Sequence, residues 1–315
     1  MLRITPIRTP ERASDHLARV HRYGAEEPPV TAWFGSGAAA KGLSGPVDGA
    51  QLETLLDGRI NEWTRLGRRR GGERDHRPGW ELMFSAPKSV SLAALVGGDQ
   101  TLLMAHDAAT REALTWLEVQ AAATRVSRGG KSHVLPTGCL LAVIVRHEIS
   151  RAAEPHLHSR VLVVNATLAG PDKWRSIVSR PLYLAARTAG IRYQQTLAEH
   201  ADKLGYGVVW NNNGTCALDG IPPALTALFS SRARAVEAQL EARGLSRATA
   251  SIAQRERATR QTRAARPQLP GEQQRQADRA RTRQAGFDLE AFVTSVRQRT
   301  ARLPATPAAQ RMEGL

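Results

Sequence analysis

The stretch HEISRAAEPHLHSRVLVVN, residues 147–165, decides the fold. The apolar run 139–145 leads into it, and a second apolar run, 161–164, closes it. Between the two runs lies a polar break that carries Glu154 and Pro155. Two such runs joined by a polar break are typical of a β-hairpin. The sequence therefore predicts two paired core strands with polar side chains at their mouth.

Three histidines lie at this mouth. Side chains alternate along a strand, so His156, His158 and Arg160 share one face, and an antiparallel partner strand can set His147 against them. Imidazoles that converge on one point are typical metal ligands. The plainer interpretation is that histidines near strand ends are partly buried polar residues. The spacing favours a metal site formed by His147, His156 and His158.

The charge of the chain indicates a polyanionic partner. Its 315 residues contain 44 Lys plus Arg against 29 Asp plus Glu, which gives a net charge of +15 and a pI of about 11.0. This length and apolar content suit a packed globular protein and exclude a peptide or a fibre. Arginine suits bidentate phosphate recognition, so nucleic acid is the leading candidate. The alternative is a protein whose arginines only reflect base composition.

Cysteine usage and hydropathy predict a cytoplasmic protein. Cys139 and Cys216 form neither a disulfide framework nor a zinc-finger spacing. No run approaches the roughly 20 apolar residues that span a bilayer. The N-terminal MLRITPIRTP has no apolar core and no small-residue cleavage site of a secretory signal. A G-x-x-x-x-G-K-[ST] loop is also missing, which argues against a nucleotide-hydrolysing motor.

The remaining periodicities predict an α+β protein. Strands are expected at 2–7 and 80–84, and core helices at 100–124 and 181–204. Thr9 and Pro10 are typical of a helix start, and that helix contains Tyr23. Further expected elements are a helix at 48–57, a basic turn at 125–133, a β-hairpin at 206–218, and a Gln- and Arg-rich tail from about 255 to about 289 that is exposed helix or partly disordered.

Four sequence blocks resemble one known family. They are GLSGPVD at 42–48, FSAPKSVSLAALVGGD at 84–99, HEISR with EPHLH at 147–158, and KLGYG at 203–207. In this order they resemble the relaxase domain of the MobF conjugative relaxases, the TrwC and TraI type. The resemblance runs from about residue 2 to about residue 265, so we expect a relaxase domain at 1–265. Residues 266–315 are then a basic, Gln- and Arg-rich C-terminal extension, helical or partly disordered.

The resemblance implies a fold and a chemistry. The fold is a twisted antiparallel sheet, the palm, flanked by helices, as in relaxases and rolling-circle initiators. The reaction is a site- and strand-specific nick at an origin of transfer by a tyrosine that keeps the 5′ phosphate covalently attached. A divalent metal, Mg²⁺ or Mn²⁺, polarises the scissile phosphate in such a site.

The family pattern is met only in part by this chain. The first two metal-binding histidines correspond to His147 and His158, but the third falls on Arg160. Glu81 matches an acidic residue that orients a metal-binding histidine or acts as a base. Arg151 matches the arginine that faces the DNA. Lys88 and the run Arg68, Arg69 and Arg70 are further expected DNA contacts.

The tyrosine set is also reduced. The first of the two tyrosine pairs that the family usually shows falls on Asp15 and His16. Of the second pair only Tyr23 is present, beside Gly24. Tyr23 is therefore the expected nucleophile, with Glu81 and Arg160 as its catalytic partners. One tyrosine is enough to nick and rejoin a strand.

The arginine at the third metal position leaves three alternatives open. His156 can replace the missing ligand, with the metal shifted towards the hairpin turn. Arg160 can itself supply the positive charge, with metal binding weak or absent. The third alternative is a degenerate site in a protein that binds DNA without cutting it.

The expected partners follow from the same resemblance. They are single-stranded or hairpin DNA at an origin of transfer, accessory relaxosome proteins and a coupling ATPase. A non-catalytic DNA-binding module of the same fold and a rolling-circle replication initiator are the competing functions.

Overall fold

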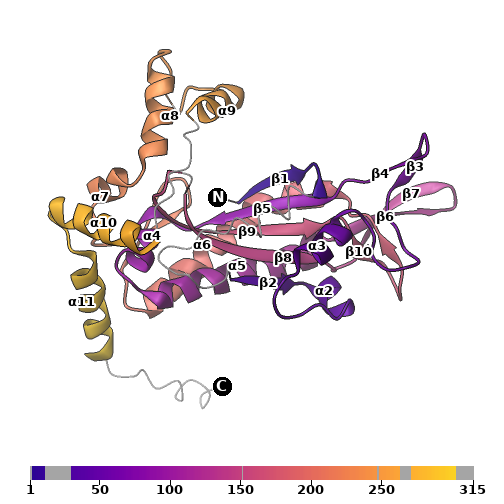
Figure 1. The fold of residues 1–315 in the computed structure, drawn as a ribbon, viewed down its shortest axis with the longest axis horizontal. Coiled ribbons are helices and arrows are strands. Elements are labelled where there is room, and N and C mark those ends of the chain that lie inside the picture. The colour runs from indigo at the N-terminus through magenta and orange to yellow at the C-terminus, as the bar shows by residue number, and fades with distance from the viewer. Residues whose placement is uncertain (1, 11–29, 151, 247, 263–270, 303–315) are drawn as a thin grey trace, which may run out of the picture.

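The protein is built on a five-stranded antiparallel sheet (Figure 1). The structure, a computed structural model, describes residues 2–10, 30–150, 152–246, 248–262 and 271–302. In spatial order the strands are β1 (Arg3–Ile7), β5 (Gly79–Ser85), β9 (Pro155–Val164), β8 (Ala142–Ile149) and β2 (Thr31–Phe34). Helices flank this sheet, so the predicted α+β fold with an antiparallel palm is confirmed.

The predicted hairpin forms the centre of the sheet. Strands β8 and β9 pair antiparallel, with Val145 opposite Arg160 and His147 opposite His158. The register shifts between His147 and Ile149, where the strands approach their turn. The inner halves of both strands are apolar on both faces because each face is covered there.

Three helices cover one face of the sheet. They are α4 (Lys88–Leu95), α5 (Gln100–Ala121) and α6 (Ser179–Lys203). Their apolar sides pack on Leu82, Phe84 and Leu157 to form the larger core. The two long core helices expected from the sequence correspond to α5 and α6. Asp99, the N-cap of α5, accepts a hydrogen bond from the backbone N–H of Thr101 and so satisfies one of the free donors at that helix end.

The opposite face is covered only in part. Helices α2 (Ser36–Ala40) and α3 (Gly49–Leu56) lie over it, and a second core of Leu162, Val164 and their neighbours fills the gap. Arg160 and His158 continue the same face beyond Leu162 but do not belong to this core. One face of β9 thus changes from apolar to polar within two residues.

Two β-ribbons project from one end of the long axis of the molecule (Figure 1). One pairs β3 (Arg68–Arg70) with β4 (Glu73–Asp75), and the other pairs β6 (Ala123–Arg128) with β7 (Lys131–Pro136). The prediction of a basic turn at 125–133 was therefore wrong, because this segment is the outer part of a ribbon. Two further strand pairs are short: β10 (Thr167–Leu168) with β11 (Trp174–Arg175), and β12 (Val208–Trp210) with β13 (Cys216–Leu218).

The C-terminal part of the described chain is helical. It contains α7 (Pro223–Leu228), α8 (Ser231–Glu241), α9 (Ile252–Gln261), α10 (Gly271–Gln284) and α11 (Leu289–Arg302). Three residues of α11 are buried in the larger core: Leu289, Val293 and Val296. The expected Gln- and Arg-rich extension is thus helical over 271–302 and attached to the palm, while a domain boundary at 265 stays a prediction.

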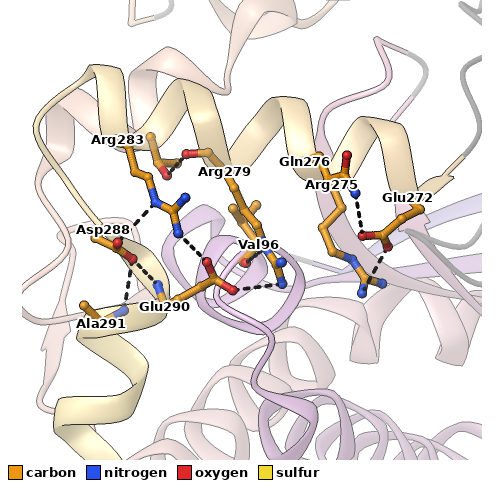
Figure 2. A network of polar contacts seen from close by, with 10 residues as sticks. Val96, Glu272, Arg275, Gln276, Arg279, Arg283, Asp288, Glu290 and Ala291 are labelled. Carbon is orange, nitrogen blue, oxygen red and sulfur yellow. Dashed lines mark hydrogen bonds and ion pairs between the residues drawn. The ribbon is translucent and has the colours of Figure 1, made fainter.

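A polar network joins α10 to α11 and to the palm. Figure 2 shows Arg283 in contact with Asp288 and Glu290, and Arg279 in contact with Glu290 and the carbonyl oxygen of Val96 at the end of α4.

None of the helices in the described ranges combines the length and the apolar composition needed to cross a lipid bilayer.

Candidate active site

The centre of the site is a cross-strand pair of histidines. His147 on β8 lies opposite His158 on β9, and the centroids of their rings are 5.1 Å apart with an angle of 15° between the ring planes. Both side chains are buried. The alternation of the two strands places them on the partly covered face of the sheet, next to the second core.

His156 extends this pair into a stack of three rings. Its ring centroid lies 4.7 Å from that of His158, at an interplanar angle of 30°. The lone pair of an imidazole nitrogen lies in the ring plane, so nearly parallel rings do not direct their lone pairs at one point. Within the described ranges, no group of three or more His, Cys, Asp or Glu side chains is placed to hold a metal ion. The predicted ligand set His147, His156 and His158 does not form in this arrangement.

The protonation of His158 follows from its hydrogen bond. Its Nδ1 lies 2.9 Å from the carbonyl oxygen of His156, which can only accept, so Nδ1 carries the proton and Nε2 the lone pair. The pKa of His158 is lowered to about 4, mainly by burial. The charges of Arg160 and Lys88 lower it further, and the hydrogen bond to the carbonyl oxygen of His156 partly opposes this shift. Burial also lowers the pKa of His156 well below its usual value. Both rings are neutral near pH 7.

Arg160 forms an ion pair with Glu81. The distance from Nη1 of Arg160 to Oε1 of Glu81 is 2.7 Å, and the two side chains are 18% and 21% exposed. Glu81 lies on β5, where Met83 is the partner of Arg160 in the β5–β9 register. Two residues that the sequence assigned to the site from separate blocks thus meet directly. The third metal position of the family holds a paired cation here.

Lys88 supports the hairpin from the start of α4. Its Nζ donates a hydrogen bond of 2.8 Å to the carbonyl oxygen of Pro155 at the beginning of β9. Burial lowers the pKa of Lys88 to about 8, although the charges of Glu154 and Asp278 raise it. Lys88 was predicted to contact DNA, and the structure places it against the protein backbone beside His156.

Glu154 links the turn of the hairpin to the C-terminal helices. Its side chain is buried, and Oε1 accepts a hydrogen bond of 2.9 Å from the backbone N–H of Ser231, the first residue of α8. A carboxylate at a helix N-terminus also interacts favourably with the helix dipole. The sequence did not predict this contact, for which its only signal is an acidic residue directly before Pro155 in a turn.

A buried chain of hydrogen bonds lies behind the site. His106 on α5 contacts the hydroxyl of Ser159 through Nε2, at 2.8 Å, and the hydroxyl of Tyr193 on α6 through Nδ1, at 2.7 Å. Burial lowers the pKa of His106 to about 3, assisted by the charges of His158 and Arg146. Ser159 lies between His158 and Arg160, so this neutral histidine fixes the strand that carries both.

The described tyrosines are poorly suited to be nucleophiles. Burial raises the pKa values of Tyr193 and Tyr206, and the hydrogen bond from Tyr206 to Asp99 raises the second further. Tyr183 is on α6, which covers the other face of the sheet. Tyr23, the predicted nucleophile, and Arg151, the predicted DNA contact, lie outside the described residues.

The two ribbons carry the remaining basic residues of interest. In the β3–β4 ribbon, Arg68 is exposed, Arg70 precedes the Gly71–Gly72 turn, and Arg69 pairs in register with Arg74. The β6–β7 ribbon, residues 123–136, contains no Asp or Glu. At its tip Arg128 is the cross-strand partner of Lys131. Like charges directly opposite each other destabilise a strand pair, so a polyanion would relieve this repulsion.

One exposed tryptophan was not among the predicted site residues. Trp63, in the loop between α3 and β3, is 90% exposed. A large aromatic side chain with almost no protein contact has little structural use in the isolated chain. The signal available was a Trp inside a polar run that leads into the arginines at 65–77.

The chain is similar in sequence to known conjugation proteins. The model of a family described as TrwC relaxase matches residues 10–285. The multifunctional conjugation protein TraI of Escherichia coli is 36% identical over 278 residues, which cover 85% of this chain and 15% of that protein. The protein of the same name from E. coli strain K12 is 31% identical over 324 residues, 100% of this chain and 18% of that protein. The chain therefore spans less than a fifth of the length of these curated relatives.

Solved structures with the same fold are conjugative relaxases. A structure of the conjugative relaxase TrwC in complex with oriT DNA superposes with a TM-score of 0.85 at 32% identity, and the match covers 92% of this chain and 100% of that one. A TrwC complex described as metal-bound gives the same values. TrwC with a 27-mer DNA comprising the recognition hairpin and the cleavage site gives a TM-score of 0.83. Family model, sequence identity and fold agree over most of the chain, which belongs to the TrwC relaxase family.

Proposed function

We propose that this chain is a DNA relaxase unit that nicks one strand at an origin of transfer during conjugative mobilisation. The observation that carries the proposal is the polar half-face of the palm, where His147, His158, Arg160 and Glu81 meet beside an otherwise apolar core. Membership of the TrwC relaxase family supports the same reaction.

Tyr23 is the proposed nucleophile. The phenolate oxygen attacks the scissile phosphorus, a tyrosyl O–P bond forms, the P–O3′ bond breaks, and the released 3′ oxygen takes up a proton. A tyrosine has an ordinary pKa near 10, so its ionisation needs a nearby positive charge. Arg160 supplies a fixed charge, and Glu81 holds that arginine in position rather than acting as the base.

The Mg²⁺ or Mn²⁺ expected from the sequence has no complete ligand set among the described side chains. The residues present do not fit a three-histidine site, because one position holds Arg160 and the three rings are stacked. The reaction proposed above is therefore written with the residues of the chain alone.

The proposed DNA substrate is a hairpin with an adjoining single strand, which is what one TrwC structure contains. Here the two basic ribbons bind the duplex stem, and Trp63 offers a stacking surface for an unpaired base. Arg151, which matches the family arginine that faces the DNA, is a proposed contact to the single strand. Accessory relaxosome proteins and a coupling ATPase are proposed partners on the strength of the family alone.

The test is covalent capture of cleaved DNA. An oligonucleotide from a candidate origin of transfer, labelled on the 3′ side of the expected nick, should yield a denaturation-resistant adduct with the wild-type protein. Tyr23→Phe should abolish the adduct, whereas the matched control Tyr183→Phe should retain it. If no origin oligonucleotide gives an adduct in Mg²⁺, in Mn²⁺ or in chelator, the chain is a DNA-binding module and the proposal fails. The match to a relaxase family disfavours a rolling-circle initiator.

A further inference from the structure

Arg160 occupies the position of the family's third metal-binding histidine, so a cationic side chain lies where the family has a metal ligand. Arg160 is two residues from His158 on the same face of β9 and is the cross-strand partner of Val145 and Met83. Its guanidinium is partly exposed and is held by Glu81 at 2.7 Å. The group is therefore both positioned by the sheet and accessible to a ligand.

We infer that Arg160 binds the scissile phosphate directly and that this site works without a divalent metal ion. The inference rests on the proposed function, because it names the group that acts on the phosphate in the same site.

The donor inventory of the site supports Arg160 as the phosphate ligand. A guanidinium has five N–H donors, more than one carboxylate can accept, so pairing with Glu81 is compatible with a second contact to a phosphate. The planar fork of an arginine matches two phosphate oxygens at once.

Electrostatics argue against a metal ion beside this arginine. A divalent cation bound by His147 and His158 would lie close to the charge of Arg160, whose backbone is fixed by its register with Val145 and whose guanidinium is held by Glu81. The family arrangement with a neutral third histidine carries no such repulsion.

The first experiment measures metal binding without DNA. Mn²⁺ is titrated by calorimetry into the wild type, Arg160→His and Arg160→Gln, with folding of each checked by circular dichroism. The expected result is no saturable binding to the wild type and a new site in Arg160→His, which restores a third imidazole. A saturable Mn²⁺ site in the wild type that disappears in His158→Gln would overturn the inference.

The second experiment measures the phosphate contact in chelator. An origin oligonucleotide carries a neutral methylphosphonate at the linkage where the adduct forms, and its affinity is compared with that of the natural DNA. The wild type should lose about tenfold or more, as expected for a charge-assisted hydrogen bond. Arg160→Gln should be weaker on natural DNA and insensitive to the methylphosphonate, whereas Arg68→Gln should weaken both DNAs equally. Equal sensitivity in wild type and Arg160→Gln would contradict the inference.

Cleavage assays distinguish failure of the metal-free inference from failure of the relaxase proposal. Cleavage by the wild type that needs Mg²⁺ or Mn²⁺ contradicts the inference and keeps the relaxase proposal. Cleavage that survives chelation and is lost in Arg160→Gln but partly kept in Arg160→Lys supports both. If no condition gives cleavage, the relaxase proposal fails and the Mn²⁺ titration alone decides whether the site is metal-free.

Discussion

The carboxylate of Glu154 accepts a hydrogen bond of 2.9 Å from the backbone N–H of Ser231. Glu154 lies in the turn of the hairpin that carries His158, and Ser231 begins α8. The helices that follow the palm in sequence are thereby joined to the turn of the active-site hairpin. The start of α8 is thus tied to the turn that precedes β9, the strand that holds His156 and His158.

Glu154→Ala should lower the free energy of unfolding by about 1–3 kcal/mol, because a buried charge-assisted bond and a helix N-terminal interaction are both lost. Urea denaturation measures this change. Glu256→Ala, which removes an exposed glutamate from α9, is the matched control and should lie within about 0.5 kcal/mol of wild type. An equal loss of unfolding free energy in the two variants would show that the contact with Ser231 does not stabilise the protein.

The Glu81–Arg160 pair should show energetic coupling. Both side chains are about four-fifths buried, so removing one partner leaves the other charge poorly compensated. In a double-mutant cycle of Glu81→Gln and Arg160→Gln, we expect a coupling of about 1.5–3 kcal/mol in unfolding free energy. Additive effects of the two substitutions would mean that the ion pair does not hold Arg160 in place.

His106 should make the protein less stable in mild acid. Its folded pKa of about 3 lies below the ordinary value of 6.5, so between these values the unfolded chain binds a proton that the folded chain does not. Stability is therefore complete above pH 6.5 and falls as the pH drops towards 3, by up to about 1.4 kcal/mol per pH unit. Urea denaturation at several pH values measures the slope.

The control for this prediction is a histidine at the surface. His106→Gln should reduce the acid slope, with the remainder coming from His156 and His158, while His133→Gln on the exposed strand β7 should leave the slope unchanged. If His106→Gln does not fold at pH 7, the comparison is made on wild-type curves alone, where a flat profile between pH 4 and 6.5 would contradict the prediction.

Trp63→Ala should weaken binding of hairpin DNA with a single-stranded tail by about 1–3 kcal/mol, because base stacking is lost. Its 90% exposure predicts no loss of stability. Fluorescence anisotropy measures the affinity. Trp210→Ala on β12 removes a second exposed tryptophan, away from the ribbons, and should bind DNA as the wild type does. Parallel losses in both variants would remove the case for stacking at Trp63.

The β6–β7 ribbon should account for part of the salt dependence of DNA binding. Replacing Arg128 and Lys131 by Gln should reduce the slope of log affinity against log salt by about 1 for each lost phosphate contact. The same double variant should be slightly more stable, because the like-charged cross-strand pair is removed. Lys203→Gln at the end of α6 is the control. An unchanged slope in the ribbon variant would show that the β6–β7 ribbon makes no phosphate contacts.

The sequence predicted the palm well because its signals are local. The two apolar runs around 147–165 determine the central hairpin, and the periodicity of α5 and α6 is strong. The ion pair between Glu81 and Arg160 could not be predicted in the same way. It depends on the pairing of β5 with β9, which joins residues almost 80 positions apart.

One weak local signal misled the prediction. Beyond the buried Ala123 and Thr124, the ribbon at 123–136 is largely exposed and basic, so its alternation resembled a basic turn. The C-terminal extension was predicted to be helical or partly disordered, and its helix α11 buries Leu289, Val293 and Val296 in the larger core. The roles assigned to Tyr23 and Arg151 stay predictions, since both residues lie outside the described ranges.

Arg160 gives the site a positive charge that belongs to the polypeptide itself. A bound ion must be acquired from the cell, competes with other ions of similar size and is lost to chelators. A guanidinium stays protonated at any physiological pH and cannot be exchanged. DNA processing that depends on Arg160 would start in any host, whatever the supply of manganese or magnesium in that cell.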